Sequence, residues 1–432
     1  MGFVTDIAYL VAGLVTMPIW LIALARKGKL RTDWWARLGL RSPELRAAAS
    51  TPGGPRVLIH AVSVGEVNAI RKLCDDLASA DVGARVVVST TTNTGIARAT
   101  ATLGGRHEVV RFPFDFSWAV WRLLEATKPD LVLLTELELW PNFLHECRRR
   151  RIPVAVVNGR LSERSFRRSQ LFRPFLRSMF ASLAKVSAQD RAYADRFVAM
   201  GTDPARVFVG GTMKWDTADM AASVAGAEDL ARDLGIDRSR GLIVAGSTAP
   251  GEDALLRRAC PTGVQLLCAP RKPEWFDSAE RDLEPCVRRS RAAKAASNAH
   301  GAASEGGGDR FLLDTIGELR KAYALADLVV IGRSFGNLHG SDMMEPAALA
   351  KAVVVGPRVG DFQATAATLL AADAMVQTSA EGLPATLASL MADRTRREGL
   401  GTRARDVVTR EQGATARTVA LARELLAQRG RA

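Results

Sequence analysis

Short, almost uninterrupted apolar segments recur along most of this chain, and they constrain its fold more than any other feature of the sequence. They begin after residue 56 and alternate with amphipathic stretches such as 67–78, whose apolar residues recur at helical spacing. A strand that is apolar throughout is typical of a parallel sheet covered by helices on both faces. The predicted buried strands of this first series are VLIHAV (57–62), RVVVSTT (85–91), LVLLTEL (131–137), PVAVVN (153–158) and KVSAQ (185–189).

A second series of the same kind occupies the other half of the chain. Two successive series predict two doubly wound α/β domains, as expected for 432 residues at roughly 100–200 residues per domain. The boundary falls near 205–235, where the segment FVGGTMKWD gives way to a polar stretch, so we expect domains at 28–217 and 218–432. The helical ending around 403–430 is well placed to cross back and pack on the first domain, and the low-complexity segment 289–309 is predicted as a flexible surface insertion. The strands of the second series are GLIVAGS (241–247), VQLLCAP (264–270), LADLVVIG (325–332) and KAVVVGP (351–357).

Composition narrows the kinds of partner. Lys and Arg total 59 against 46 acidic residues, so the formal net charge is +13, which favours an anionic partner such as nucleic acid, a phosphorylated substrate or an anionic membrane. An apolar share of 47% and a charged share of 24% exclude a disordered or fibrous chain. The five cysteines contain no CxxC pair, which argues against a disulfide framework and a structural zinc site and fits a reducing compartment.

The amino terminus carries an apolar run of 18 residues, 7–24, followed at once by a basic cluster at 26–31. Eighteen helical residues rise about 27 Å, just enough to cross a hydrocarbon core. Asp6 and Pro18 weaken such a span, so an interfacial anchor and a buried helix that caps a domain both stay open. We expect residues 1–27 to attach the chain to a membrane, with the basic cluster holding the remainder on the cytoplasmic side.

The turn after the first predicted strand is a candidate site, because ligands of doubly wound domains bind at the carboxyl ends of strands. Ser63 and Gly65 form this turn, and Glu66 follows in the first turn of the next helix. A carboxylate at that position can accept a proton from an incoming hydroxyl, which transfer to an alcohol requires. The alternative is that Glu66 is only a favourable first-turn charge.

Two further carboxylates, Glu136 and Glu138, follow the very apolar strand that begins at residue 131, and alternation places them on one face of it. Burying carboxylates without partners is costly, so a functional role is one interpretation and pairing with nearby arginines is the other.

A dense basic region with interleaved aromatic residues extends from 148 to 180. Arginine suits bidentate phosphate binding, and the aromatic side chains suit an apolar partner, so together they favour an amphiphile with phosphate head groups. A nucleic-acid patch or a solvated basic face would resemble it. Its arginines include Arg160, Arg164, Arg167 and Arg168, which we expect to bind this amphiphile as the acceptor of the hydroxyl-directed transfer.

The second half of the chain contains phosphate-binding candidates at strand ends. Lys214 follows a strand near the predicted domain boundary, and Arg271 follows the strand 264–270. A glycine-containing loop precedes a helix whose start carries Asp342 and Glu345, so backbone N–H groups can meet a phosphate while a carboxylate holds ribose hydroxyls. No Walker A or GxGxxG motif occurs at these places, which disfavours a P-loop or dinucleotide site.

The order of these motifs resembles that of the 3-deoxy-D-manno-octulosonic acid (Kdo) transferases of lipopolysaccharide synthesis. Each motif is weak alone, but the ordered set is specific and covers nearly the whole chain. The motifs are WWARLG (34–39), HAVSVGE (60–66), TTTNTG (90–95), FPFD (112–115), ELELWPN (136–142), NGRLSERS (158–165), AQD (188–190), GTMKWD (211–216), AGSTAPGE (245–252), APRKPE (269–274), IGEL (316–319), DMMEPAA (342–348) and GP (356–357).

The resemblance implies two Rossmann-like domains facing a cleft (the GT-B type) and an inverting, metal-independent transferase without a cofactor. Its donor would be CMP-Kdo and its acceptor an anionic lipid A precursor at the cytoplasmic face of the inner membrane, with no nucleic acid bound. By the match, Glu66 is the base, and Glu136 and Lys214 support the transition state. The matching CMP-binding residues are Pro270, Arg271, Ile316, Gly317, Glu318, Asp342, Met343, Met344 and Glu345.

The chain departs from the family pattern mainly on the nucleotide side. Lys272 and Ala249 replace histidines, and 339–345 has the sequence HGSDMME where the family usually has Gly-Gly-His-Asn-x-x-Glu. Ala36 also stands where the family often has Glu. A glycosyltransferase that uses a UDP-sugar is therefore the nearest alternative, followed by a non-catalytic relative and a basic, membrane-tethered binder.

Overall fold

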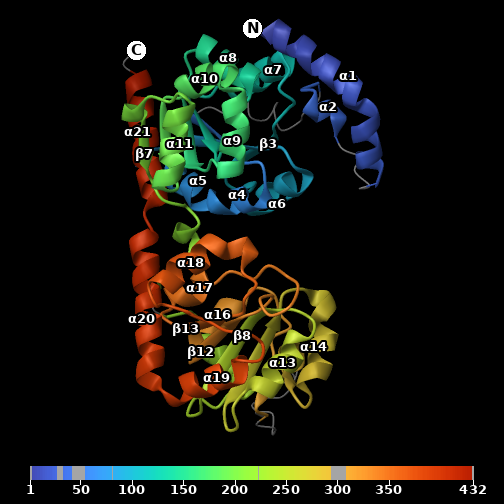
Figure 1. Cartoon of the computed structure of the whole chain (residues 1–432), viewed down its shortest axis with the longest axis vertical. Coiled ribbons are helices and arrows are strands. Elements are labelled where there is room, and N and C mark those ends of the chain that lie inside the picture. Colours follow the sequence, from blue (N-terminus) through green and yellow to red (C-terminus); the bar gives the residue numbers. More distant parts are fainter. Residues whose placement is uncertain are drawn as a thin grey trace. The chain divides into compact units, whose positions relative to one another are not determined.

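The computed structural model divides the chain into two units, one formed by Met1–Thr217 with Gln412–Ala432 and the other by Ala218–Glu411 (Figure 1). It describes residues 2–26, 33–40, 54–79, 81–221, 223–292 and 308–430. Most of the predicted insertion at 289–309 lies outside these residues. Within them, each unit is built on a seven-stranded sheet in which every pairing is parallel, and this confirms the predicted pair of doubly wound α/β domains.

The sheet of the first unit has the order β3-β2-β1-β4-β5-β6-β7. Each strand predicted from the first apolar series is present, because runs such as LVLLT bury every side chain and need covering on both faces. The strands are β1 (Arg56–His60), β2 (Arg85–Thr90), β3 (Glu108–Arg111), β4 (Leu131–Thr135), β5 (Val154–Gly159), β6 (Lys185–Ala188) and β7 (Val207–Val209).

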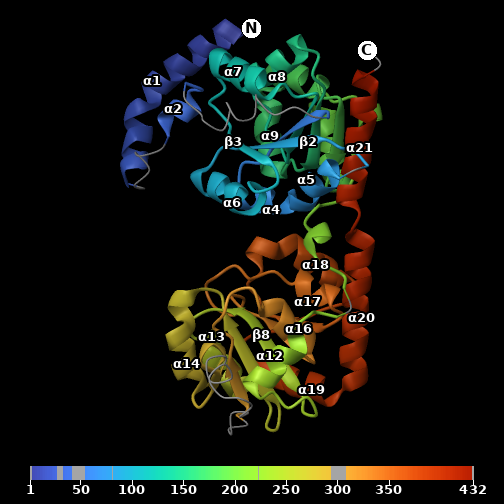
Figure 2. The same cartoon turned by 180° about the vertical axis from the view of Figure 1, so that it is seen from behind.

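Helices cover both faces of this sheet (Figures 1 and 2). One face packs on α7, α8, α10 and α11, and the other on α5, α6 and α21. The helices of this unit are α1 (Gly2–Arg26), α2 (Trp34–Arg37), α4 (Val64–Ala69), α5 (Arg71–Ala78), α6 (Asn93–Leu103), α7 (Ser117–Thr127), α8 (Pro141–Arg149), α9 (Glu163–Leu171), α10 (Arg173–Ala181), α11 (Arg191–Met200) and α21 (Ala414–Arg429).

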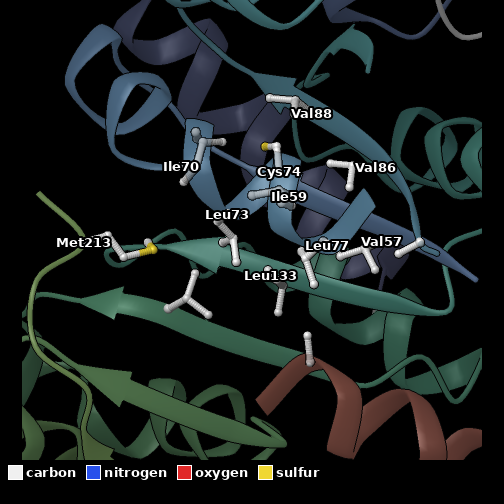
Figure 3. Close-up of a cluster of buried hydrophobic side chains, with 14 of the residues drawn as sticks. Val57, Ile59, Ile70, Leu73, Cys74, Leu77, Val86, Val88, Leu133 and Met213 are labelled. Atoms are coloured by element: carbon white, nitrogen blue, oxygen red, sulfur yellow. The ribbon is translucent and has the colours of Figure 1, made fainter. Parts of the chain in front are cut away.

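The core beside α21 explains why the end of the chain belongs to the first unit. Ile59, Leu73 and Leu133 lie in it together, and Figure 3 shows them with Met213 among the buried side chains. Leu421, Ala422 and Leu425 of α21 extend the same cluster. Asp216 fixes the start of α21, because its carboxylate accepts hydrogen bonds from the backbone N–H groups of Gly413 (2.6 Å) and Thr415 (2.5 Å).

The start of α1 is tied to the rest of the first unit by two buried carboxylates. The Asp6 carboxylate accepts hydrogen bonds from the backbone of Ser117 and the amide of Asn142. Asp115 accepts from the backbone of Asn142 and Phe143 and from the hydroxyl of Tyr9. Burial raises the pKa of Asp115 to about 6, although these donors oppose the shift.

The sheet of the second unit has the order β10-β11-β9-β8-β12-β13-β14. Its strands are β8 (Leu242–Thr248), β9 (Gln265–Pro270), β10 (Val287–Arg288), β11 (Arg310–Leu312), β12 (Leu328–Ile331), β13 (Ala352–Val355) and β14 (Val376–Gln377). Its helices are α12 (Ala227–Leu234), α13 (Glu252–Ala259), α14 (Phe276–Leu283), α16 (Leu319–Leu325), α17 (Met344–Ala348), α18 (Gln363–Ala371), α19 (Leu383–Ala392) and α20 (Arg394–Glu411).

Candidate active site

The strand order of the first sheet reverses between β1 and β4, and the carboxyl ends of such neighbouring strands form the usual binding crevice of a doubly wound domain. The loop after β1 carries Ser63 and leads into α4, and the loop after β4 carries Glu136 and Glu138. The predicted acid–base groups of the first domain therefore meet at one edge of the sheet.

Glu66 lies in the first turn of α4 and forms a capping box with Ser63. Its Oε1 accepts hydrogen bonds from the Ser63 backbone N–H (3.2 Å) and the Ser63 hydroxyl (2.8 Å). Its Oε2 accepts from the Val62 backbone N–H (2.9 Å) and the Thr135 hydroxyl (2.7 Å). Glu66 is partly exposed, and Gly65 beside it is exposed. The carboxylate is thus held rigidly at the mouth of the crevice, with two fixed and two rotatable donors.

Thr135, which the sequence did not single out, contacts the carboxylate of Glu66 directly. It is the last residue of β4 and is buried, and its Oγ1 lies 2.7 Å from Glu66 Oε2 and 2.8 Å from the carbonyl oxygen of His60. Both neighbours accept, but the hydroxyl has a single proton to donate. The hydroxyl can therefore face either one, and it can accept a hydrogen bond from Glu66 when that carboxyl group is protonated.

Glu136 and Glu138 belong to the loop after β4, not to the strand. Glu136 has a left-handed backbone (φ 58°), so the alternation of a strand does not govern the direction of either side chain and the predicted shared strand face is wrong. Burial and the charge of Glu66 raise the pKa of Glu136, while Arg160 and Lys214 oppose the shift. Burial, then Glu66, raises the pKa of Glu138 to about 7, although its bond from the Trp140 indole N–H (3.1 Å) opposes this.

Arg160 and Lys214 are the cations whose charges act on Glu136. Arg160 follows β5, and its backbone N–H donates to the Glu136 carbonyl (3.4 Å). Lys214 follows β7 and is exposed, while the next residue, Trp215, is buried. The structure thus brings Glu66, Glu136, Arg160 and Lys214 into one electrostatic site.

His60 begins the HAVSVGE motif, but its ring is part of the core. It is fully buried, packs against Phe112 with ring centroids 4.0 Å apart and ring planes tilted by 32°, and has Nδ1 3.0 Å from the Ser89 hydroxyl. Burial lowers the pKa of His60 to about 3, so the ring is neutral at physiological pH.

The other predicted acceptor-binding residues lie on α9. Arg164 and Arg168 form no ion pair with any described residue, whereas Arg167 pairs with Glu163 one turn earlier. Near them Phe172 and Phe175 are exposed, although Phe180 is buried in the core. The predicted basic and aromatic surface is therefore present at α9 and α10.

The predicted nucleotide-binding segments lie at the carboxyl ends of strands in the second unit. Pro270 ends β9, and Arg271 is exposed after it, with its backbone N–H bonded to the Thr248 carbonyl (3.0 Å). Ile316 is 83% exposed, and Gly317 has a left-handed backbone (φ 93°). These residues offer a solvent-facing cation and an accessible turn.

Glu318 is already neutralised by groups of its own domain. Its carboxylate accepts hydrogen bonds from Arg289 Nε (3.1 Å), the Thr315 hydroxyl (2.6 Å) and Lys321 Nζ (3.1 Å). Burial alone would raise the pKa of Glu318, but these donors lower it to about 2. Its side chain is therefore a support for the turn.

The loop at 342–345 differs from its prediction in two respects. Helix α17 begins at Met344, two residues later than expected, and Asp342 accepts from the Met344 backbone N–H (2.8 Å). The side chains of Met343 and Met344 are buried in the core, because they are apolar and anchor the short helix. Glu345 is half-buried 4.0 Å from Arg320, and burial is the main cause that raises its pKa.

Glu252 has no counterpart in the predicted site, although it ends the AGSTAPGE motif. It is 4% exposed, and its carboxylate accepts from the backbone N–H groups of Ala249 (2.9 Å), Arg333 (2.6 Å) and Phe335 (3.0 Å). It joins the loops after β8 and β12, where the second sheet reverses its strand order. The motif was visible in the sequence, but its partners lie about 80 residues away, at separations of 81 and 83.

The described residues contain no cluster of three or more His, Cys, Asp or Glu side chains arranged to hold a metal ion. Among the same residues, no helix combines the length and the apolarity required to cross a membrane.

Comparison with known proteins places these features in a family. Residues 32–217 match the family model described as 3-deoxy-D-manno-octulosonic-acid transferase (kdotransferase). The chain is 31% identical over 422 residues to the 3-deoxy-D-manno-octulosonic acid transferase of Bordetella pertussis, covering 93% of this chain and 94% of the relative. It is 28% identical over 395 residues to the enzyme of the same name from Haemophilus influenzae, covering 88% and 89%.

Solved structures support the same fold. The crystal structure of MurG from Acinetobacter baumannii is similar with a TM-score of 0.54 and 16% identity, covering 86% of this chain and 100% of that one. At such low identity the likeness concerns the fold alone, and the two parallel-sheet domains resemble those of GT-B glycosyltransferases.

Proposed function

Because this chain belongs to the 3-deoxy-D-manno-octulosonic acid (Kdo) transferase family, we propose that it transfers Kdo from CMP-Kdo to a hydroxyl group of a lipid A precursor. It is a glycosyltransferase of lipopolysaccharide synthesis. The observation that carries the proposal is the 31% identity to a Kdo transferase over 93% of the chain. The donor nucleotide, the acceptor and the roles of individual residues are our inferences.

Glu66 is proposed as the general base. The acceptor oxygen attacks the anomeric carbon of Kdo while its proton passes to Glu66 and CMP departs with the electrons of the broken bond, so the configuration inverts. Two of the four donors to Glu66 are N–H groups that cannot turn away, but the Ser63 and Thr135 hydroxyls can rotate. A lone pair can therefore be released to the acceptor hydroxyl.

Thr135 suits this role because it stabilises Glu66 before and after proton transfer. With Glu66 ionised, the Thr135 proton faces Glu66 Oε2. Once Glu66 holds the proton, its O–H can donate to Thr135 Oγ1 while the threonine proton turns to the His60 carbonyl. The hydrogen bond at 2.7 Å is thus regained after transfer, once the Glu66 O–H has turned to Thr135 Oγ1 and the threonine hydroxyl has turned to the His60 carbonyl.

Glu136 and Lys214 are proposed to support the transition state. The charges of Lys214 and Arg160 act on Glu136, so these three side chains contribute to the electrostatic field beside Glu66. On the donor side, the exposed cation of Arg271 is suited to the phosphate of CMP, and Glu345 to its ribose hydroxyls. No cofactor or metal is proposed, and turnover should survive a chelator of divalent ions.

We place the enzyme at the cytoplasmic face of the inner membrane. The basic cluster after residues 7–24 and the exposed apolar side chains of α1, which include Leu14 and Val15, support membrane attachment. The arginines of α9 that form no ion pair within the described residues, Arg164 and Arg168, are suited to the phosphates of an anionic acceptor.

Turnover with labelled donors tests the proposal. The full-length protein is incubated with a lipid A precursor and either CMP-Kdo or a panel of UDP-sugars, and the mass of the lipid product is measured. A mass increase of one or more Kdo units with CMP-Kdo is the expected result. Turnover with UDP-sugars alone would contradict the donor and leave the two-domain fold untouched.

A further inference from the structure

Two neighbouring cavities of the first unit lie outside the crevice that holds Glu66. The first, of about 390 Å³, lies between α8, α10 and the start of α1, and the second, of about 570 Å³, lies between the end of α8, the start of β5 and α21. Leu144, Arg148 and Ser182 line both cavities, so the two are adjacent. Their volumes fall in the range of roughly 300–1,000 Å³ that is usual for ligand sites.

The first cavity is mainly apolar. Leu144, Leu176 and Met179 line it, and Phe175 stands at its rim with 80% of its surface exposed. Its wall also contains His145, whose Nδ1 is buried and has no hydrogen-bond partner among the described residues. An unpaired buried nitrogen is costly, and a ligand oxygen such as an ester carbonyl would satisfy it.

The second cavity is rich in arginine. Arg148, Arg150, Arg151 and Arg429 line it. Arg150 is bridged to Glu146 and Glu125, but Arg148 and Arg151 are exposed and form no ion pair with any residue that the structure describes. Two unneutralised guanidinium groups beside one cavity are suited to a phosphate.

From this pairing we infer a binding site for one anionic glycerophospholipid of the membrane, with an acyl chain in the apolar cavity and the phosphate between Arg148 and Arg151. The charge of the second cavity selects the anionic head group, and the apolar lining of the first selects the chain. Leu171, Phe172 and Phe175 are exposed on α9 and α10 and provide an apolar approach from the bilayer.

This site is separate from the crevice proposed for catalysis. The arginine cavity lies where β5 begins, at Val154, whereas Glu66 and Glu136 lie where β1 and β4 end. The six residues of β5 rise about 3.3 Å each, so the amino ends and the carboxyl ends of the strands are roughly 16–20 Å apart. The lipid is therefore a membrane component that holds the first domain at the bilayer, and not the acceptor that reacts at Glu66.

Photo-crosslinking tests the site without depending on glycosyl transfer. The full-length protein is placed in phosphatidylcholine nanodiscs that contain a small fraction of phosphatidylglycerol or phosphatidylcholine with a diazirine on one acyl chain. After irradiation, the labelled peptides are identified by mass spectrometry. We expect labelling of residues 174–182, which line the apolar cavity, and about tenfold more of it with phosphatidylglycerol than with phosphatidylcholine.

Variants assign the labelling to the two cavities. Arg148→Ala combined with Arg151→Asn should lower the labelling about tenfold. Asparagine is chosen at position 151 because it tolerates the left-handed backbone there (φ 54°). Ser178→Trp, at an exposed position, should block the apolar cavity without changing Tm. The matched control is Arg149→Ala, because Arg149 is adjacent to Arg148 but is paired with Glu146 and should not affect labelling.

The inference is overturned if the double variant and Ser178→Trp both keep parental labelling, or if the two lipids label equally. Labelling confined to peptides other than 174–182 would also overturn it, because the acyl chain would then lie outside the apolar cavity. Kdo transfer to a detergent-dispersed acceptor is measured in parallel. If the parent protein shows no Kdo transfer, the proposed function is contradicted, but the labelling result still stands.

Discussion

Thr135→Val is the substitution that most directly tests how the proposed base is supported. Valine keeps the β-branched shape that suits the end of β4 but removes the hydroxyl. The carboxylate of Glu66 then loses the donor at 2.7 Å, and the His60 carbonyl loses its contact at 2.8 Å. After proton transfer, the protonated Glu66 also lacks the oxygen that would accept its bond.

The size of the effect follows from the charge of the acceptor. A hydrogen bond to a charged group contributes roughly 1.5–3 kcal/mol. If about half to all of that is specific to the proton-transfer step, the loss is about 0.75–3 kcal/mol, and kcat should fall by roughly 3- to 150-fold at about 1.4 kcal/mol for each factor of ten. The KM values for donor and acceptor should change little, because Thr135 is buried and its hydroxyl bonds to Glu66 and to the His60 carbonyl. The free energy of unfolding should fall by about 1–2 kcal/mol.

Steady-state kinetics and chemical denaturation of the parent, Thr135→Val, Thr135→Ser and Thr127→Val test this expectation. Thr135→Ser keeps the hydroxyl and should recover most of the parental kcat. Thr127→Val is the matched control, because Thr127 is equally buried but its hydroxyl bonds to the Leu123 carbonyl inside α7. Parental kcat in Thr135→Val would refute the proton-handling role. A serine variant as slow as the valine variant would do so too, since it would show that the methyl group matters and the hydroxyl does not.

Three further substitutions test the remaining roles. Glu66→Gln should lower kcat by roughly 10²–10⁴ with little change in CMP affinity, and near-normal turnover would move the base elsewhere. Between pH 4.5 and 7 the raised pKa of Glu138 makes the folded chain hold more protons than the unfolded chain, so its contribution to stability declines as pH rises through that window. Denaturation of Glu138→Gln should therefore show a gain over the parent at pH 8 that disappears at pH 4, and a gain independent of pH would contradict the assignment. Glu345→Ala should weaken CMP binding at least tenfold, or about 1.4 kcal/mol, in calorimetric titration, whereas unchanged binding or a preference of the parent for UMP would contradict the donor site.

The main strands could be predicted from the sequence because each is a nearly continuous run of apolar residues. RVVVST and LVLLT become β2 and β4 at nearly the predicted bounds, and their burial on both faces is what the composition required. The strands that were not predicted, β3, β10, β11 and β14, are two to four residues long. Such short segments form because longer neighbours already provide an edge to pair with, and their own residues carry too little periodicity to indicate them.

The site was predictable only where its chemistry is local in the sequence. Glu66 and Ser63 are three residues apart, so their capping arrangement follows from the motif itself. Thr135 acts through the pairing of β1 with β4, which sets His60 opposite Leu134, and no spacing in the sequence expresses that register. Met343 and Met344 show the converse case, because the matching motif includes them while their side chains serve the core.

In both domains a glutamate carboxylate bridges two segments of the chain at the point where the sheet reverses its strand order. A glutamate follows the first strand of each sheet, Glu66 after β1 and Glu252 after β8. Across the reversal, the Glu66 carboxylate reaches the last residue of β4 and the Glu252 carboxylate reaches the loop after β12. All three donors to Glu252 are backbone N–H groups, and the side chain is 4% exposed, so this carboxylate can only tie loops together. Glu66 is partly exposed, and two of its four donors are hydroxyls that rotate. The same clamp is therefore fixed in one domain and can release a lone pair in the other, which is the property that a base at the crevice requires.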